Sequence, residues 1–246
     1  MKLFGLIGYP LGHSFSKQYF TEKFEKEGIA DCMFEAFPIL SIGEFPLLIK
    51  NNPGLKGLSV TIPYKEQVLQ FVDELSDEVR VIGAANSIKI SNGKLTAYNT
   101  DIVGFEKSFS KLLQQHHTKA LVLGNGGASK AVQYVLRKKG IDYLVVTRNT
   151  AGKENHIAYN NIDEAIMNEY PVIINCSPVG MYPKDSIAPA IPYQFISSRH
   201  YLYDLVYKPE ETLFLKEGKQ RGAAAQNGFE MLLIQAEESW RIWNNG

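Results

Sequence analysis

The sequence predicts an α/β protein with two domains and a C-terminal helix that packs back on the first domain. Three observations lead to this expectation. Strand-like and helix-like segments alternate from residue 2 to residue 62, a hairpin pattern interrupts them at 87–99, and the alternation restarts at residue 119. Such alternation favours parallel sheets covered by helices. The predicted domains are 1–101 together with 226–246, and 102–225.

The first domain is expected to be mostly parallel. Its predicted elements, in order, are a strand at 2–8, a helix that ends at Gly28, a strand at 32–37, a helix at about 41–50 and a strand at 55–62. Pro63 suits the first turn of a further helix, where its missing N–H costs nothing. Asn92-Gly93 lies between two alternating segments and predicts a hairpin, because a type I′ turn needs positive φ at both central residues.

The second domain repeats the strand–helix order. Its predicted elements are a helix at 102–115, a strand at 120–124, a helix at 128–140, a strand at 143–147, a short helix within 153–169, strands at 172–178 and 201–207, and a helix at 209–222. The apolar segment 229–243 is then the C-terminal helix.

A glycine-rich loop, LVLGNGGASKA, lies between the first strand of the second domain and its helix. Gly124 permits the turn, Gly126 lets backbone N–H groups approach a pyrophosphate, and the helix N-terminus favours phosphate charge. Ser129 stands where the third glycine of G-x-G-x-x-G is expected. The loop is either an ordinary glycine turn or, as its context favours, the dinucleotide site of a Rossmann-like domain.

The strand that follows this helix ends at Thr147-Arg148-Asn149, with Lys153 just beyond. An NAD site is expected to carry an acidic residue here, which accepts a hydrogen bond from the ribose 2′-hydroxyl. Arginine can instead pair with a 2′-phosphate. The sequence therefore favours NADP, and the alternative is that Arg148 is an ordinary surface residue.

Lys65 is an unusual residue for the first turn of a helix. The helix macrodipole disfavours a cation there by about 0.3–1 kcal/mol. The side chain either reaches into water or is kept for chemistry. Asp101 begins the next predicted helix, where it can cap the helix, orient the Lys65 ammonium, or do both.

Composition excludes several classes of protein. The 246 residues carry 26 Lys+Arg and 26 Asp+Glu, and this balance argues against a nucleic-acid or membrane-surface partner. Two distant cysteines, Cys32 and Cys176, form no disulfide framework, so a reducing cytoplasm is expected. The histidines show no metal-binding spacing, and His116-His117 is expected in a solvated loop. Neither a membrane span nor a signal peptide is expected.

Several short motifs resemble those of the shikimate dehydrogenase family, in the same order along nearly the whole chain. They are GYPLGHSFS (8–16), VTIPYK (60–65), GAAN (83–86), NTD (99–101), NCSPVGM (175–181), Asp204 with YKP (207–209), and Gly228 with Met231-Leu232 and Gln235. Each motif alone is modest, whereas the ordered set is specific.

This resemblance implies a reversible, NADP-linked reduction of 3-dehydroshikimate to shikimate in aromatic amino acid (chorismate) biosynthesis, in a cleft between a substrate domain and an NADP-binding domain. It implies that Lys65 and Asp101 are catalytic. The implied substrate contacts are Ser14, Ser16, Thr61, Asn86, Asp101, Tyr207 and Gln235. The implied cofactor contacts are Gly124, Asn125, Gly126, Gly127, Ala128, Thr147, Arg148, Asn149, Lys153, Leu205 and Gly228. No metal is implied.

The chain also departs from the family pattern. Ser59 replaces an asparagine that often precedes the V-T pair and helps to bind substrate, and Asn125 replaces an alanine of the glycine loop. Two other functions therefore stay open: a quinate/shikimate dehydrogenase that uses NAD, and a non-catalytic paralogue on the same fold. The expected partner is the small-molecule substrate, and the expected assembly is a monomer or a homodimer.

Overall fold

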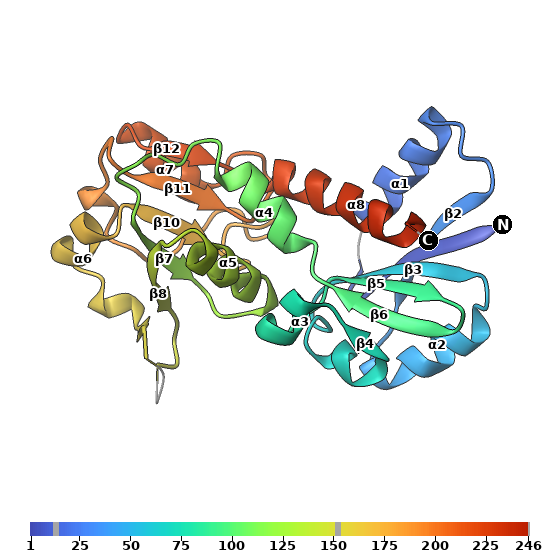
Figure 1. The fold of residues 1–246 in the computed structure, drawn as a ribbon. Coiled ribbons are helices and arrows are strands. Elements are labelled where there is room, and N and C mark those ends of the chain that lie inside the picture. Colours follow the sequence, from blue (N-terminus) through green and yellow to red (C-terminus); the bar gives the residue numbers. More distant parts are fainter. Residues whose placement is uncertain (12–14, 151–153, 246) are drawn as a thin grey trace. The chain divides into compact units, whose positions relative to one another are not determined.

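The computed structural model describes residues 1–11, 15–150 and 154–245. The chain divides into two compact units, Met1–Thr100 with Gln235–Gly246, and Asp101–Ile234. Each unit contains one six-stranded sheet with helices packed on it (Figure 1). The predicted α/β fold with two parallel-rich sheets is therefore confirmed.

The sheet of the first unit has the strand order β2-β1-β3-β5-β6-β4. Its strands are β1 (Lys2–Gly8), β2 (Cys32–Pro38), β3 (Leu55–Val60), β4 (Glu74–Leu75), β5 (Ser87–Ser91) and β6 (Lys94–Tyr98). β5 is antiparallel to both β3 and β6, and the other pairs are parallel. Asn92 and Gly93 both have positive φ, 53° and 77°, so the predicted β5–β6 hairpin is confirmed.

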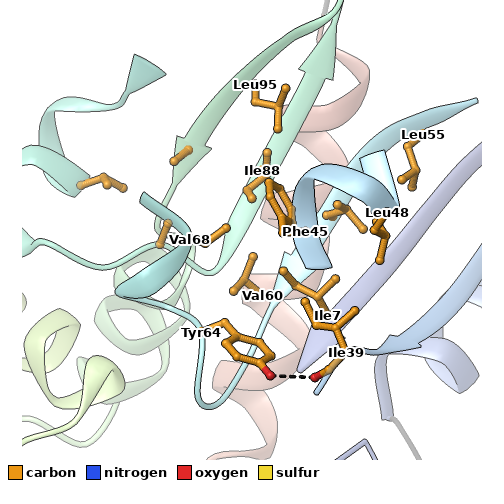
Figure 2. Packing of buried hydrophobic residues seen from close by; sticks show 14 residues of the cluster. Ile7, Ile39, Phe45, Leu48, Leu55, Val60, Tyr64, Val68, Ile88 and Leu95 are labelled. Atoms are coloured by element: carbon orange, nitrogen blue, oxygen red, sulfur yellow. Dashed lines mark hydrogen bonds between the residues drawn. The ribbon is translucent and has the colours of Figure 1, made fainter. Parts of the chain in front are cut away.

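Helices cover both faces of this sheet. They are α1 (Phe15–Lys26), α2 (Phe45–Asn51), α3 (Asp77–Ile82), the 3₁₀-helices Ile42–Glu44 and Gln67–Phe71, and the end of α8 (Phe229–Asn244). Because successive strand residues point to opposite faces, Ile7 joins the core with α2 (Figure 2), whereas Phe4 and Leu6 join a second core with α1 and α8. Trp243 lies in this second core, as expected for a C-terminal helix that packs on the first domain.

The sheet of the second unit is entirely parallel, with the order β12-β11-β10-β7-β8-β9. Its strands are β7 (Lys119–Leu123), β8 (Asp142–Val146), β9 (His156–Ile157), β10 (Val172–Asn175), β11 (Tyr201–Asp204) and β12 (Ala224–Gln226). The chain moves outward from β7 through β8 to β9 and then returns to the other side of β7 at β10. The strand order therefore reverses between β7 and β10, where doubly wound sheets bind ligands.

The helices of this unit are α4 (Asp101–Phe109), α5 (Gly127–Lys138), α6 (Glu164–Glu169), α7 (Leu213–Gln220), the start of α8, and the 3₁₀-helices Tyr159–Asn161 and Tyr193–Phe195. Two of the helices of this unit, α6 and α7, begin at a side-chain cap. The side chains of Asp163 and Thr212 accept backbone N–H groups at the starts of α6 and α7. Such capping bonds satisfy donors that the helix itself cannot pair.

The division between the units lies after Thr100 and after Ile234, whereas the sequence placed it after residue 101 and before residue 226. Residues 226–234 lie with the second unit because β12 pairs with β11 and the Gly228 N–H bonds the Val206 carbonyl. One helix, α8, therefore contributes residues to both units.

Three local expectations from the sequence are wrong. Residues 62 and 63 form a turn rather than a helix start, and the helix that follows is the 3₁₀-helix Gln67–Phe71, so Lys65 is not in a first helical turn. The helix that starts at Asp101 ends at Phe109, earlier than predicted. His117 is buried, with 3% exposure, because its ring bonds backbone groups of Gln114 and Arg199.

Candidate functional site

Strand ends bring several predicted site residues to one edge of the first sheet. β1, β3 and β6 run in the same direction and end at this edge, and the antiparallel β5 begins there. Thr61 therefore follows β3 beside the end of β1, and its N–H donates to the Ile7 carbonyl over 2.9 Å. Asn86 precedes β5, and its carbonyl accepts from the Val60 N–H over 2.8 Å.

The Asn86 side chain is the centre of a buried polar network at this edge. It is 4% exposed, and its Oδ1 accepts the Thr100 N–H over 2.6 Å. Its Nδ2 lies 3.0 Å from the Thr100 hydroxyl and 3.4 Å from Gln235 Oε1. The Thr100 hydroxyl also lies 3.0 Å from that of Ser239. The network joins the end of β6 to α8 within the first unit, and it gives Gln235 the partly buried position predicted for it.

Lys65 is held at the same edge by its backbone. Its carbonyl accepts the Ala85 N–H over 2.8 Å, which ties the turn after β3 to the residue before Asn86. The neighbouring Tyr64 ring is buried in the core, and its hydroxyl donates to the Ile39 carbonyl over 2.7 Å (Figure 2). The Lys65 side chain itself is partly exposed.

Two other predicted substrate residues, Ser16 and Asp101, follow strands β1 and β6 in the sequence, and a third, Ser14, lies outside the described residues. Ser16 is the second residue of α1 and is partly exposed. Asp101 follows Thr100 directly, is 6% exposed and begins α4.

In the second unit, the backbone of the glycine loop at position 124 has a conformation that a residue with a side chain would strain. Gly124 has a φ of 106°, and a Cβ atom there would lie 3.3 Å from backbone atoms of Cys176 and Ser177. Its N–H donates to the Val146 carbonyl over 2.9 Å. Residue 124 must therefore stay small and left-handed where the β7 and β10 loops touch.

The start of α5 is open to a ligand. Gly126 is the N-cap, and a Cβ atom there would meet no heavy atom within 4 Å. Asn125 and Gly126 are exposed, while Gly127 and Ala128 are partly exposed. The unpaired N–H groups of a helix N-terminus attract phosphate. This loop can therefore hold the diphosphate of a dinucleotide.

Ser129 explains the departure from the glycine pattern. Its side chain is fully buried, its hydroxyl donates to the Gly124 carbonyl over 2.8 Å, and it accepts from Gln133 Nε2 over 3.0 Å. The serine thus pairs a carbonyl of the loop and holds the loop on α5.

The loop after β8 carries the predicted 2′-phosphate residues. Thr147 extends the pairing of β8 with β9 by one hydrogen bond, from its N–H to the Ile157 carbonyl over 3.0 Å. Arg148 and Asn149 are exposed. Burial raises the pKa of the nearby Tyr159, and the positive charge of Arg148 opposes that rise. Lys153 falls outside the described residues.

Leu205 and Gly228 fit together in a way the sequence could not show. A Cβ atom on Gly228 would lie 2.3 Å from the Leu205 carbonyl oxygen, so a larger residue would push the two segments apart. The Leu205 N–H donates to the Asn175 carbonyl over 2.9 Å. Tyr207 follows in the same loop, and burial raises its pKa.

Asn175 and Asp204, to which the sequence analysis assigned no role, hold the loops after β10 and β11 by hydrogen bonds. Asp204 is fully buried and accepts from Asn175 Nδ2 over 2.9 Å, from the Val206 N–H over 3.0 Å and from the Thr212 hydroxyl over 2.6 Å. The only sequence signal for this arrangement is their membership of the NCSPVGM and D-x-x-Y-K-P motifs.

Cys176 lies in the first of these loops. Burial raises the pKa of its thiol, with a further contribution from the Asp204 charge, so the thiol is not an activated nucleophile.

Among the described residues, no three His, Cys, Asp or Glu side chains are arranged to hold a metal ion, and no helix has the length and apolar character that a membrane span requires. A cavity of about 600 Å³ lies along α1 and β2, lined by residues that include Lys17, Phe24 and Glu35, and no predicted site residue lines it.

Comparison with known proteins identifies relatives over the whole chain. Residues 6–88 match the model of the shikimate dehydrogenase substrate binding domain. A shikimate dehydrogenase (NADP(+)) of Caldanaerobacter subterraneus is 35% identical, over 98% of this chain and 91% of the relative.

Solved structures of shikimate dehydrogenases resemble this chain over its whole length. The shikimate dehydrogenase of Aquifex aeolicus superposes with a TM-score of 0.88 at 34% identity, over 100% of this chain and 93% of that chain. The Thermus thermophilus enzyme, solved in complex with NADP(H) and shikimate, gives a TM-score of 0.87 at 29% identity, over 100% and 94% of the two chains. On its fold, its ordered motifs and these relatives, the chain belongs to the shikimate dehydrogenase family.

Proposed function

We propose that this protein is an NADP-dependent shikimate dehydrogenase, an oxidoreductase that reversibly reduces 3-dehydroshikimate to shikimate in aromatic amino acid (chorismate) biosynthesis. The observation that carries the proposal is the arrangement around Asn86. Its backbone neighbour Ala85 bonds the Lys65 carbonyl, and its side chain bonds Thr100, which precedes Asp101 in the chain. The backbone of Lys65 is thus fixed by the residue before Asn86, and the residue before Asp101 is fixed by the Asn86 side chain.

The two units are proposed to divide the work. Met1–Thr100 with Gln235–Gly246 corresponds to the predicted substrate domain, and the match of residues 6–88 to a substrate-binding family model supports this role. Asp101–Ile234 corresponds to the predicted dinucleotide domain, and its glycine loop at the reversal of strand order supports that role.

Lys65 and Asp101 are the proposed proton-transfer pair. Reduction of a ketone builds negative charge on the carbonyl oxygen, and the Lys65 ammonium would deliver a proton there, while the reverse reaction needs the amine as base. Asp101 would orient the ammonium. The partly exposed Lys65 side chain on a fixed backbone suits this role.

The remaining substrate contacts are proposed from polar side chains. Ser14 and Ser16 would bind the carboxylate at the start of α1, and Thr61, Asn86, Tyr207 and Gln235 would bind the ring hydroxyls and carbonyl. Asn86 and Gln235 are already bonded to each other and to Thr100. Such satisfied polar groups hold their geometry before substrate arrives.

The proposed NADP contacts are Gly124, Asn125, Gly126, Gly127, Ala128, Thr147, Arg148, Asn149, Lys153, Leu205 and Gly228. The open backbone at Gly126 fits a diphosphate, and the exposed Arg148 fits a 2′-phosphate. When bound, the cofactor supplies the hydride, and the protein supplies orientation and the proton.

One assay tests the proposal. The purified protein is mixed with NADP⁺ and shikimate, and reduction of the cofactor is followed by absorbance. The assay is repeated with NAD⁺ and with quinate. We expect the highest kcat/KM with NADP⁺ and shikimate. A preference for quinate or NAD⁺ would favour the alternative dehydrogenase, and no turnover with any pair would favour a non-catalytic paralogue.

The partners and location follow from the same proposal. A small-molecule substrate is the proposed partner, and the assembly is proposed to be a monomer or a homodimer, to be decided by light scattering. We propose a cytoplasmic location because Cys32 and Cys176 are free thiols, as a reducing compartment would keep them.

A further inference from the structure

We propose that Asp204 is a positioning residue for the cofactor, which acts through Asn175 to hold the loop 175–179 against the glycine loop. The inference rests on the proposed function, because it assumes that NADP(H) binds at the glycine loop. It assigns to a buried carboxylate, remote in sequence from that loop, a role in cofactor affinity.

Asp204 occupies a buried position with three hydrogen-bond donors around it. It ends β11, beside β10, and is fully buried. Its three hydrogen-bond donors are all neutral: an amide, a backbone N–H and a hydroxyl. A buried carboxylate is costly unless it is hydrogen-bonded. Burial raises the pKa of Asp204 to about 6, and the bonds from Thr212, Val206 and Asn175 oppose that rise.

The two carboxylate oxygens of Asp204 have different hydrogen-bond partners. Oδ1 accepts from Asn175 and from the Val206 N–H, whereas Oδ2 accepts from the Thr212 hydroxyl. The Thr212 hydroxyl also accepts the Leu215 N–H at the start of α7. Oδ1 therefore accepts from the loops after β10 and β11, and Oδ2 accepts from the residue that caps α7.

The Asn175 side chain makes several hydrogen bonds within the loop that follows it. Its Nδ2 also donates to the Val179 carbonyl over 3.1 Å, and its Oδ1 accepts from the N–H and the hydroxyl of Ser177 over 3.1 and 2.7 Å. One amide thus sets the conformation of residues 175–179. Asp204 fixes the orientation of that amide, because its Oδ1 can only accept.

The loop 175–179 also contacts the proposed cofactor site. The Cys176 N–H donates to the Leu123 carbonyl over 2.9 Å, and backbone atoms of Cys176 and Ser177 approach Gly124 closely. The loop therefore lies against the glycine loop at the reversal of strand order between β7 and β10, the position at which doubly wound sheets bind dinucleotides. If the loop 175–179 moves, the glycine loop loses its packing contacts with Cys176 and Ser177.

The experiment measures the Kd for NADPH by fluorescence titration, and the KM for shikimate, in folded variants. Asp204→Ala removes one acceptor of Asn175 and should raise the Kd about tenfold or more, because the amide that shapes residues 175–179 is no longer held in one orientation. The KM for shikimate should stay within about twofold of the wild type. Asp204→Asn keeps an acceptor oxygen for Asn175 and should restore most of the affinity.

Thr212→Val is the matched control. It removes the bond to Oδ2 and the α7 cap, yet leaves Oδ1 with Asn175. We expect lower thermal stability with a Kd for NADPH close to that of the wild type. If Thr212→Val weakens NADPH binding as much as Asp204→Ala does, Asp204 acts only through general stability and the inference fails.

Asn175→Ala tests whether Asp204 acts through Asn175, and this test remains available if Asp204→Ala does not fold. It should raise the Kd for NADPH, and the Asp204→Ala/Asn175→Ala double variant should be no weaker than the weaker single variant. Native affinity in folded Asn175→Ala, or fully additive losses in the double variant, overturns the inference. Absence of NADPH binding by the wild type would instead overturn the proposed function.

Discussion

A Cβ atom on Gly57 would lie 2.3 Å from the indole ring of Trp243, so β3 and α8 meet at a point where only glycine fits. Trp243 is 5% exposed and stacks on Phe4, with 5.4 Å between ring centroids. Gly57→Ala should displace the indole and lower the free energy of unfolding by about 1–3 kcal/mol, as overpacking of cores does. Urea denaturation measures this loss. Gly43→Ala is the control, since the atom nearest its added Cβ is 3.6 Å away, and an equal loss in both variants would contradict the argument.

Lys65→Ala tests the proposed proton donor. The kcat for shikimate oxidation should fall by about 10²–10⁴-fold, the usual contribution of a general acid–base group, while KM changes much less. Lys56→Ala, at an exposed lysine of β3, should leave steady-state kinetics unchanged. A Lys65→Ala enzyme with near-normal kcat would remove Lys65 from the mechanism.

Arg148→Ala tests the choice of cofactor. Arg148 is exposed after β8, so its loss should not affect folding. The KM for NADP⁺ should rise about tenfold or more, because charge-assisted bonds to the 2′-phosphate are lost, while the KM for NAD⁺ should barely change. Arg80→Ala, at another exposed arginine, is the control. An unchanged ratio of the two KM values would assign 2′-phosphate binding to other residues.

Two buried histidines should make the protein less stable in weak acid. His117 and His200 are each 3% exposed, and each Nδ1 accepts a backbone N–H, from Gln114 and Ser197 respectively. Each ring is therefore neutral, with its proton on Nε2 facing a backbone carbonyl. Burial lowers the pKa of both rings.

The sign of the pH effect follows from these pKa values. The unfolded chain has histidines with a pKa of about 6.5, so below that pH it binds more protons than the folded protein. The free energy of unfolding should then fall as pH decreases from 7 to 5. Asp204, with a raised pKa, contributes the opposite sign, so the measured quantity is the difference between wild type and His200→Gln. A flatter pH dependence in the variant is expected, and an identical slope would show that His200 does not contribute.

The sequence predicted the elements whose signals are local. Alternating apolar segments gave the central strands of both sheets, and Asn92-Gly93 gave the hairpin because those residues adopt positive φ cheaply. Gln235 was placed correctly by its apolar neighbours. The glycine pattern between a strand and a helix located the loop at 124–128, and the family motifs picked out Asn86.

Tertiary packing decided what the sequence could not. Pro63 looked like a helix start, but the burial of Tyr64 and its bond to the Ile39 carbonyl turn the chain into the core first. His117 looked solvated, yet its two ring nitrogens satisfy a distant carbonyl and a local N–H. The bonds of Asp204 join residues far apart in sequence, and no periodicity in the sequence reports such a contact.

The two-part composition of the first unit has a consequence for biosynthesis. Proteins generally fold domain by domain from the N-terminus as the chain is made. Here the aromatic core around Phe4 and Phe20 is completed by Trp243, and the indole that packs on Gly57 comes from the end of α8, which is translated after the whole second unit up to Ile234. The second unit, although translated later, can finish folding before the first. A nascent chain would therefore carry an uncovered apolar surface until α8 has been synthesised, and chaperones that bind such surfaces would be needed most before that point.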